Sequence, residues 1–193
     1  LSGNPGPWHL NSLTVLSVAS SEWLSRQKCQ KYWPGNGLYL NGLKHICDGA
    51  AQSLSNHKGV LEMNSLKRLS DSAAESLSLR WGTLSLDGLT ELSDSAAESF
   101  SGFFGIGNSR PWLSLDGLTE LSDAAAEKLS LFQGSKLDLR GLRKLSDSAA
   151  KSLSQMPSDT ELILNGLTEL SDAAAESLSK FKYHIYLRGV DDE

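Results

Sequence analysis

Cys47 and His45 are the residues in this sequence whose types and spacing best suit chemistry. We expect a helix to begin at Cys47, and the N-terminus of a helix favours the thiolate form of a cysteine. His45 would then be a nearby base, and the pair would form the centre of a cysteine-dependent enzyme. The sequence offers no third group to orient His45, and Cys47 replaces a serine that recurs elsewhere in the chain. We therefore favour a conservative substitution over a reactive site.

Other patterns of catalytic residues are missing from the sequence. It contains no Gly-x-Ser-x-Gly, His-Glu-x-x-His, Cys-x-x-Cys or Gly-Lys-Ser/Thr motif. The glycine-rich segment 102–107 lacks the lysine and hydroxyl of a phosphate-binding loop. Histidine occurs at four unrelated positions, His9, His45, His57 and His184. We predict that the protein is not an enzyme and that it binds no metal or cofactor.

The charge balance also excludes some partners. The chain has 18 Lys and Arg against 23 Asp and Glu, a net charge of −5, and no large basic cluster. We expect no binding to nucleic acid, because the phosphate backbone is contacted mainly by basic residues. No apolar run approaches the roughly 20 residues that cross a bilayer, so we expect no membrane partner. A Cys29–Cys47 disulfide is not expected, because Cys29 should close one helix and Cys47 should open the next.

A single motif recurs along the chain, and its clearest copy begins Leu113-Ser-Leu115-Asp-Gly-Leu118. The period is about 23 to 25 residues, within the leucine-rich-repeat range, with insertions near residues 26–37 and 101–112. The copies start at Trp8, Leu38, Leu61, Leu84, Leu113, Leu137, Leu162 and Ile185. We predict one domain over residues 1–193.

Each copy predicts a short strand, a turn and a short helix. The two leucines of Leu-x-Leu point to one face of a strand, because side chains alternate along it. A glycine then allows the chain to turn. We expect the aspartate of each Ser-Asp pair to cap a helix, as Asp71 would for a helix over roughly residues 72–78. A helix of this length is unstable alone, so each unit must pack against the next and form a solenoid.

The motif Leu-x-Leu-x-Gly-Leu-x-x-Leu-Ser-Asp-x-Ala-Ala-Glu-x-Leu-Ser resembles the leucine-rich repeat, most closely its cysteine-containing and GALA-like subclasses. The resemblance covers about residues 8–190. It implies an α/β, right-handed, horseshoe-like solenoid with a parallel concave sheet of about eight short strands and about seven short convex helices. The family usually has Asn or Cys where this chain has leucine or valine, so we expect no ladder of side-chain hydrogen bonds at that position. Those residues are Leu13, Leu43, Leu66, Leu89, Leu118, Leu142, Leu167 and Val190.

The outward strand positions vary between units while the leucines repeat, so packing does not dictate them. Both insertions precede a strand and carry aromatic residues in a Gly/Pro setting, which favours lips beside the sheet. The candidate partner-binding residues are Tyr39, Glu62, Trp112, Asp138, Arg140, Tyr186, Arg188, Trp33, Phe103 and Phe104. Two alternatives stay open: the sheet face is an ordinary solvated surface, or the aromatic side chains of the insertions fold back over the core.

We predict a non-enzymatic binding module that recognises a protein or peptide through the concave sheet and the aromatic insertions. The alternative is a structural or assembly segment of a longer repeat array without its own ligand. A solenoid exposes an apolar cross-section at each end unless a cap covers it. The last copy stops after Ile185-Tyr-Leu187-Arg-Gly-Val190, so we expect that end to be a truncation point or a surface for end-to-end self-association.

Overall fold

The computed structural model describes residues 7–26, 37–103 and 111–187. These residues form repeating β–α units of about 24 residues, which confirms the predicted α/β repeat architecture. The strands are β1 (Trp8–His9), β2 (Gly37–Tyr39), β3 (Val60–Glu62), β4 (Leu84–Ser85), β5 (Trp112–Ser114), β6 (Lys136–Asp138), β7 (Glu161–Ile163) and β8 (Ile185–Tyr186). The helices are α1 (Val18–Ser25), α2 (Asp48–Leu54), α3 (Asp71–Ser78), α4 (Asp94–Ser101), α5 (Asp123–Leu129), α6 (Asp147–Leu153) and α7 (Asp172–Ser179).

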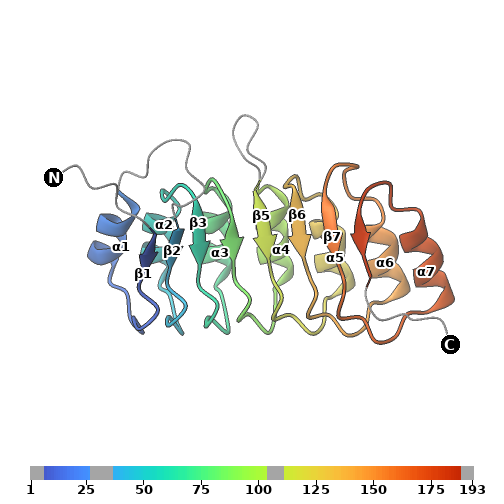
Figure 1. Cartoon of the computed structure of the whole chain (residues 1–193), viewed down its shortest axis with the longest axis horizontal. Coiled ribbons are helices and arrows are strands. Elements are labelled where there is room, and N and C mark those ends of the chain that lie inside the picture. Colours follow the sequence, from blue (N-terminus) through green and yellow to red (C-terminus); the bar gives the residue numbers. More distant parts are fainter. Residues whose placement is uncertain (1–6, 27–36, 104–110, 188–193) are drawn as a thin grey trace.

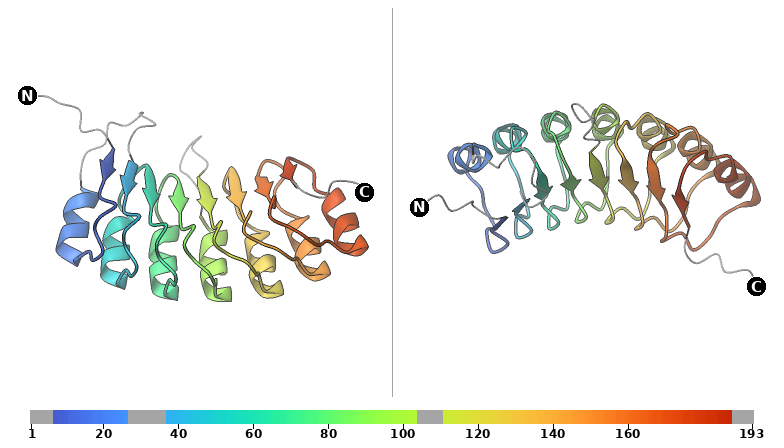
Figure 2. Two further views of the ribbon diagram at one scale, coloured as in Figure 1. Left: turned by 60° about the horizontal axis from the view of Figure 1, so that its bottom comes forward. Right: turned by 45° about the horizontal axis from the view of Figure 1, so that its top comes forward.

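The units stack in sequence order to form two layers. The strands make one parallel sheet in the order β1 to β8, and the helices form a second layer beside it (Figure 1). The stack bends with the helices on its outer side and the strands on its inner side, as the right-hand view of Figure 2 shows. The register keeps the first leucine of each motif aligned, as in the pairs Leu38–Leu61 and Leu61–Leu84.

The core lies between the two layers. Leu61 and Met63 of one unit are fully buried, as are Ala73, Ala74 and Leu77 of the helix that follows. The small alanines let the helix approach the sheet closely, and each buried leucine stabilises the fold by about 1.5–3 kcal/mol. Packing of this kind stabilises helices of seven or eight residues that would not form alone.

Serines cap the helices, which corrects the expectation that the aspartates do so. In α3, the Ser70 hydroxyl accepts a hydrogen bond from the Ala73 amide at 3.1 Å, and Asp71 is the first helical residue. The aspartate links units instead, because its carboxylate accepts from the capping serine of the next unit. This serine–aspartate ladder consists of the pairs Ser70–Asp48, Ser93–Asp71, Ser122–Asp94, Ser146–Asp123 and Ser171–Asp147.

Cys47 interrupts this pattern of caps. It occupies the N-cap of α2, makes no side-chain cap hydrogen bond and is exposed. The first residue of α1 is Val18 rather than an aspartate. A serine at position 47 would therefore have no carboxylate in the preceding unit to which it could donate. The serine–aspartate ladder therefore begins one unit later, at Asp48.

The Cys47→Ser variant should be more stable than the wild type by about 0.5–1 kcal/mol, because a serine hydroxyl would accept from the first turn of α2. Urea denaturation followed by circular dichroism would measure the change. Ser93→Cys is the matched control and should lose about 1 kcal/mol or more, because it removes both a cap and a ladder contact. Equal stability of Cys47→Ser and wild type would contradict this account of the cap.

A row of buried side chains follows the helices, which we call the helix-exit row. Each backbone amide in it donates to the carbonyl three residues earlier in the preceding helix or its last turn. The row consists of His57, Arg80, Phe103, Phe132, Met156 and Phe181. Phe103 is fully buried, and its ring centroid lies 6.3 Å from that of Phe132. The prediction that Phe103 forms part of a lip beside the sheet is therefore wrong. Phe103 belongs to the core, in agreement with the alternative that the aromatic side chains of the insertion fold back over it.

Arg80 is the charged member of the helix-exit row and is fully buried. Its guanidinium donates to backbone carbonyls, with Nη1 2.5 Å from the Thr83 oxygen and Nη2 2.8 Å from the Gly59 oxygen. Burial lowers the pKa of Arg80 to about 9, so the group is still protonated at neutral pH. The guanidinium thus joins two successive units through their backbones.

Candidate functional site

A ladder of side-chain hydrogen bonds lies at the carboxyl ends of the strands. It is built two residues before the leucine position at which the sequence predicted no ladder, so that prediction does not cover it. Each backbone amide donates to the side-chain oxygen of the preceding unit, at 3.0–3.2 Å. This strand-end ladder runs through Asn11, Asn41, Asn64, Asp87 and Asp116.

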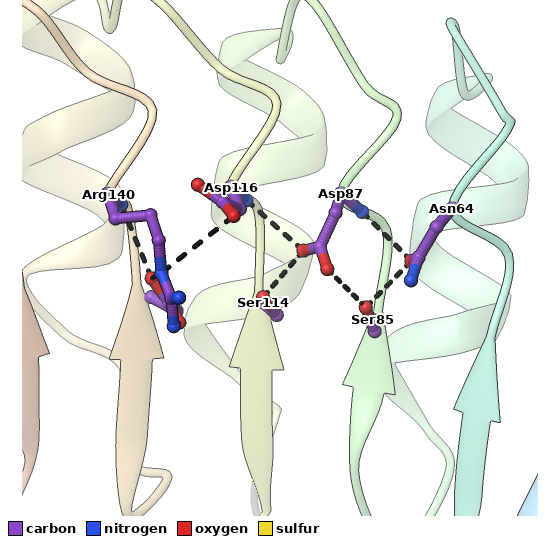
Figure 3. A network of polar contacts seen from close by, with 7 residues as sticks. Asn64, Ser85, Asp87, Ser114, Asp116 and Arg140 are labelled. Carbon is purple, nitrogen blue, oxygen red and sulfur yellow. Dashed lines mark hydrogen bonds and ion pairs between the residues drawn. The ribbon is translucent and has the colours of Figure 1, made fainter. Parts of the chain in front are cut away.

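Serine hydroxyls surround the carboxylate of Asp87 in this ladder (Figure 3). The Ser114 hydroxyl donates to Asp87 Oδ1 at 2.5 Å, and the Ser85 hydroxyl lies 2.8 Å from Oδ2. The Asp116 amide donates to Oδ1 at 3.2 Å. The carboxylate of Asp87 therefore contacts neutral hydrogen-bond donors from its own unit and from the next.

The strand-end ladder changes at Arg140. The Arg140 amide lies 3.3 Å from Asp138 Oδ1, so it bonds within its own unit rather than to Asp116. The Arg140 guanidinium also pairs with Asp138, through Nε at 3.0 Å and through Nη2. Asp138 is fully buried beneath this contact. Arg140 therefore compensates the charge of Asp138. Its backbone amide, which would otherwise donate to Asp116, donates to Asp138 instead.

Asp116 has few partners as a result. Within the described residues its carboxylate accepts no hydrogen bond, and its nearest cation is Arg140 Nε at 3.8 Å. Burial raises the pKa of the Asp116 carboxyl; Arg140 opposes this rise, and the charges of Asp138 and Asp87 add to it. The side chain is 37% exposed, so Asp116 presents a weakly compensated carboxylate at the sheet face.

These carboxylates line a groove on the inner face of the sheet, with a volume of about 320 Å³. The groove extends from β2 to β6, and its lining includes Tyr39, Glu62, Asp87, Trp112, Asp116 and Arg140. The Tyr39 ring stacks on His9 with 4.4 Å between centroids, and Lys136 Nζ lies 4.4 Å from the centre of the Trp112 ring. The indole N–H of Trp112 is buried and has no acceptor in the part of the chain that the structure describes.

The structure brings together five of the residues predicted from the sequence. Tyr39, Glu62, Trp112, Asp138 and Arg140 all line the groove, although Asp138 is buried under the arginine. Tyr186 lies on β8, is 45% exposed and does not line the groove. Three more predicted residues, Trp33, Phe104 and Arg188, lie outside the described residues.

Asp87 and Asp116 were missing from the predicted site. Both stand at a repeat position that carries Asn or Asp in most units. That run of short hydrogen-bonding side chains was the signal for a ladder between units, and it also marks the polar floor of the groove.

Residues 7–26, 37–103 and 111–187 contain no group of three or more His, Cys, Asp or Glu side chains placed so that they could hold a metal ion. No helix in these ranges is long and apolar enough to cross a membrane.

The chain has no significant match among models of protein families or among curated proteins. Function must therefore be inferred from the site itself.

Proposed function

We propose that this chain is a leucine-rich repeat protein that binds a protein or peptide through the inner face of its sheet, without catalysis. The observation that carries the proposal is the groove between β2 and β6. Its lining combines two aromatic rings, Tyr39 and Trp112, with charged groups on neighbouring strands. Aromatic residues and arginine are typical of the anchors at protein interfaces. The strand-end ladder supports the family assignment, because it joins the first five units in succession at the ends of their strands.

The Tyr39→Ala variant should bind a partner about tenfold more weakly than the wild type, because it removes an aromatic wall of the groove. Short random peptides displayed on phage would be selected on the whole chain, and fluorescence anisotropy would measure the affinity of each selected peptide. Tyr183→Ala is the matched control. Tyr183 is exposed, and like Tyr39 it contacts a histidine ring, with 4.6 Å between centroids, but it does not line the groove. If every selected peptide binds both variants as tightly as the wild type, the groove is not the binding site.

One observation favours the second candidate function, a segment that assembles end to end. Tyr186 and Leu187 are 45% and 39% exposed at the last strand of the described sheet. Exposed apolar side chains beside a strand favour pairing with another chain. A molecular mass that rises with concentration in light scattering, and falls again in Leu187→Lys, would support assembly over peptide binding.

A further inference from the structure

The groove has an excess of negative charge. Among the described residues, four carboxylates line it, those of Glu62, Asp87, Asp116 and Asp138. The guanidinium of Arg140 also lines it, and the ammonium of Lys136 lies over the Trp112 ring. Arg140 is committed to Asp138 by two contacts from its guanidinium, so it compensates Asp116 only weakly, at 3.8 Å. Glu62 accepts one hydrogen bond, from the side-chain amide of Asn41 at 3.1 Å. The charge of the groove is therefore complementary to a cation.

The walls of the groove suit the rest of such a ligand. Tyr39 and Trp112 offer aromatic surface, and the ring of Trp112 already carries an ammonium group, that of Lys136. Aromatic rings attract ammonium and guanidinium groups and also contact the aliphatic part of a long basic side chain.

We propose that the partner inserts a basic side chain, lysine or arginine, into this groove, where Asp116 is its principal counter-ion. The proposal rests on the proposed function, because it specifies the chemistry of the peptide that the same groove would bind. Asp116 is the natural contact because Asp87 is satisfied by serine hydroxyls and a backbone amide, and Asp138 is buried under Arg140. The aromatic rings would hold the peptide, and Asp116 would select its charge.

The selection of phage-displayed peptides on the whole chain tests this. Lysine or arginine should be enriched at one position of the selected peptides. Replacing that arginine with citrulline, or that lysine with acetyl-lysine, removes the charge at nearly the same length and should weaken binding about fivefold to tenfold. The Asp116→Asn variant should bind the basic peptides more weakly than the wild type, by a similar factor. This variant should fold, because Asn41 and Asn64 occupy the same position in other units.

Glu120→Gln is the control for net charge. Glu120 is exposed, lies four residues further along the chain and does not line the groove, so its replacement should leave the affinity unchanged. Peptides that lose affinity for Tyr39→Ala but show no basic residue, or bind Asp116→Asn as tightly as the wild type, would overturn the charge proposal and leave the proposed function intact. If no selected peptide depends on Tyr39, the proposed function fails, and the charge proposal fails with it.

Discussion

Gly141→Ala should destabilise the protein by about 3 kcal/mol, although it adds a single methyl group. A Cβ atom at position 141 would lie 1.9 Å from the Asp116 carbonyl oxygen and 2.6 Å from that of Leu118. Both atoms belong to the backbone of the preceding unit, so no rotation of a side chain can relieve the contact. Relief requires β6 and its turn to move away from β5, which strains the pairing of Leu113 with Leu137.

Chemical denaturation followed by circular dichroism would measure the effect at Gly141. Gly102→Ala is the matched control, because among the described residues a Cβ there would meet only the Ser99 carbonyl oxygen, at 3.6 Å, which is an ordinary contact. We expect the Gly102 variant to stay within about 0.5 kcal/mol of the wild type. A Gly141 variant as stable as the Gly102 variant would show that the units are not packed as closely as described.

Arg80→Ala should lose about 4 kcal/mol, the other large effect we expect. The substitution empties a fully buried position and removes the donors to the Thr83 and Gly59 carbonyls. Arg80→Met would restore most of the volume without the donors, so its stability should lie between those of Arg80→Ala and the wild type. The difference in stability between the two variants would separate the cost of the cavity from the cost of the lost hydrogen bonds.

Arg68→Ala is the matched control for Arg80→Ala. Arg68 is also an arginine of the third unit, but its side chain is 82% exposed and it pairs with Glu91 at 2.9 Å. Exposed ion pairs contribute about 0–1 kcal/mol, so this variant should remain close to the wild type in thermal and urea denaturation. Similar losses for the two arginine variants would contradict a structural role for the buried guanidinium.

Much of the fold was predictable from the sequence because the leucine pattern repeats. Leu38, Leu61 and Leu84 were predicted to open equivalent strands, and the register pairs them. The expected helix near residues 72–78 is α3, one residue longer. The error about capping was local: Ser and Asp are adjacent, both accept hydrogen bonds from amides, and only the geometry distinguishes the cap from the link to the next unit.

The polar contacts of the site and the burial of Arg80 were not predictable, because they depend on contacts between units that the pattern of a single repeat does not contain. Asp87 and Asp116 occupy the same repeat position, yet Asp87 accepts several hydrogen bonds and Asp116 accepts none within the described residues. The difference comes from Arg140, one unit later, whose amide bonds to Asp138 instead. Arg80 was missed for a similar reason, because a charged residue beside Trp81 is typical of a surface. Its alignment with Phe103 identifies it as a core residue only once the units are stacked.

In the described residues, every contact of the strand pairs and of both ladders lies between units that are immediate neighbours in the chain. A closed barrel must meet itself, so its strand number and diameter are linked. No such closure limits the number of units in an open stack. Duplicating or deleting one whole unit of about 24 residues would leave the remaining junctions with the same partners. Proteins built in this way can therefore evolve in length by steps of one unit, and a new unit extends the inner face of the sheet without rebuilding the units already there.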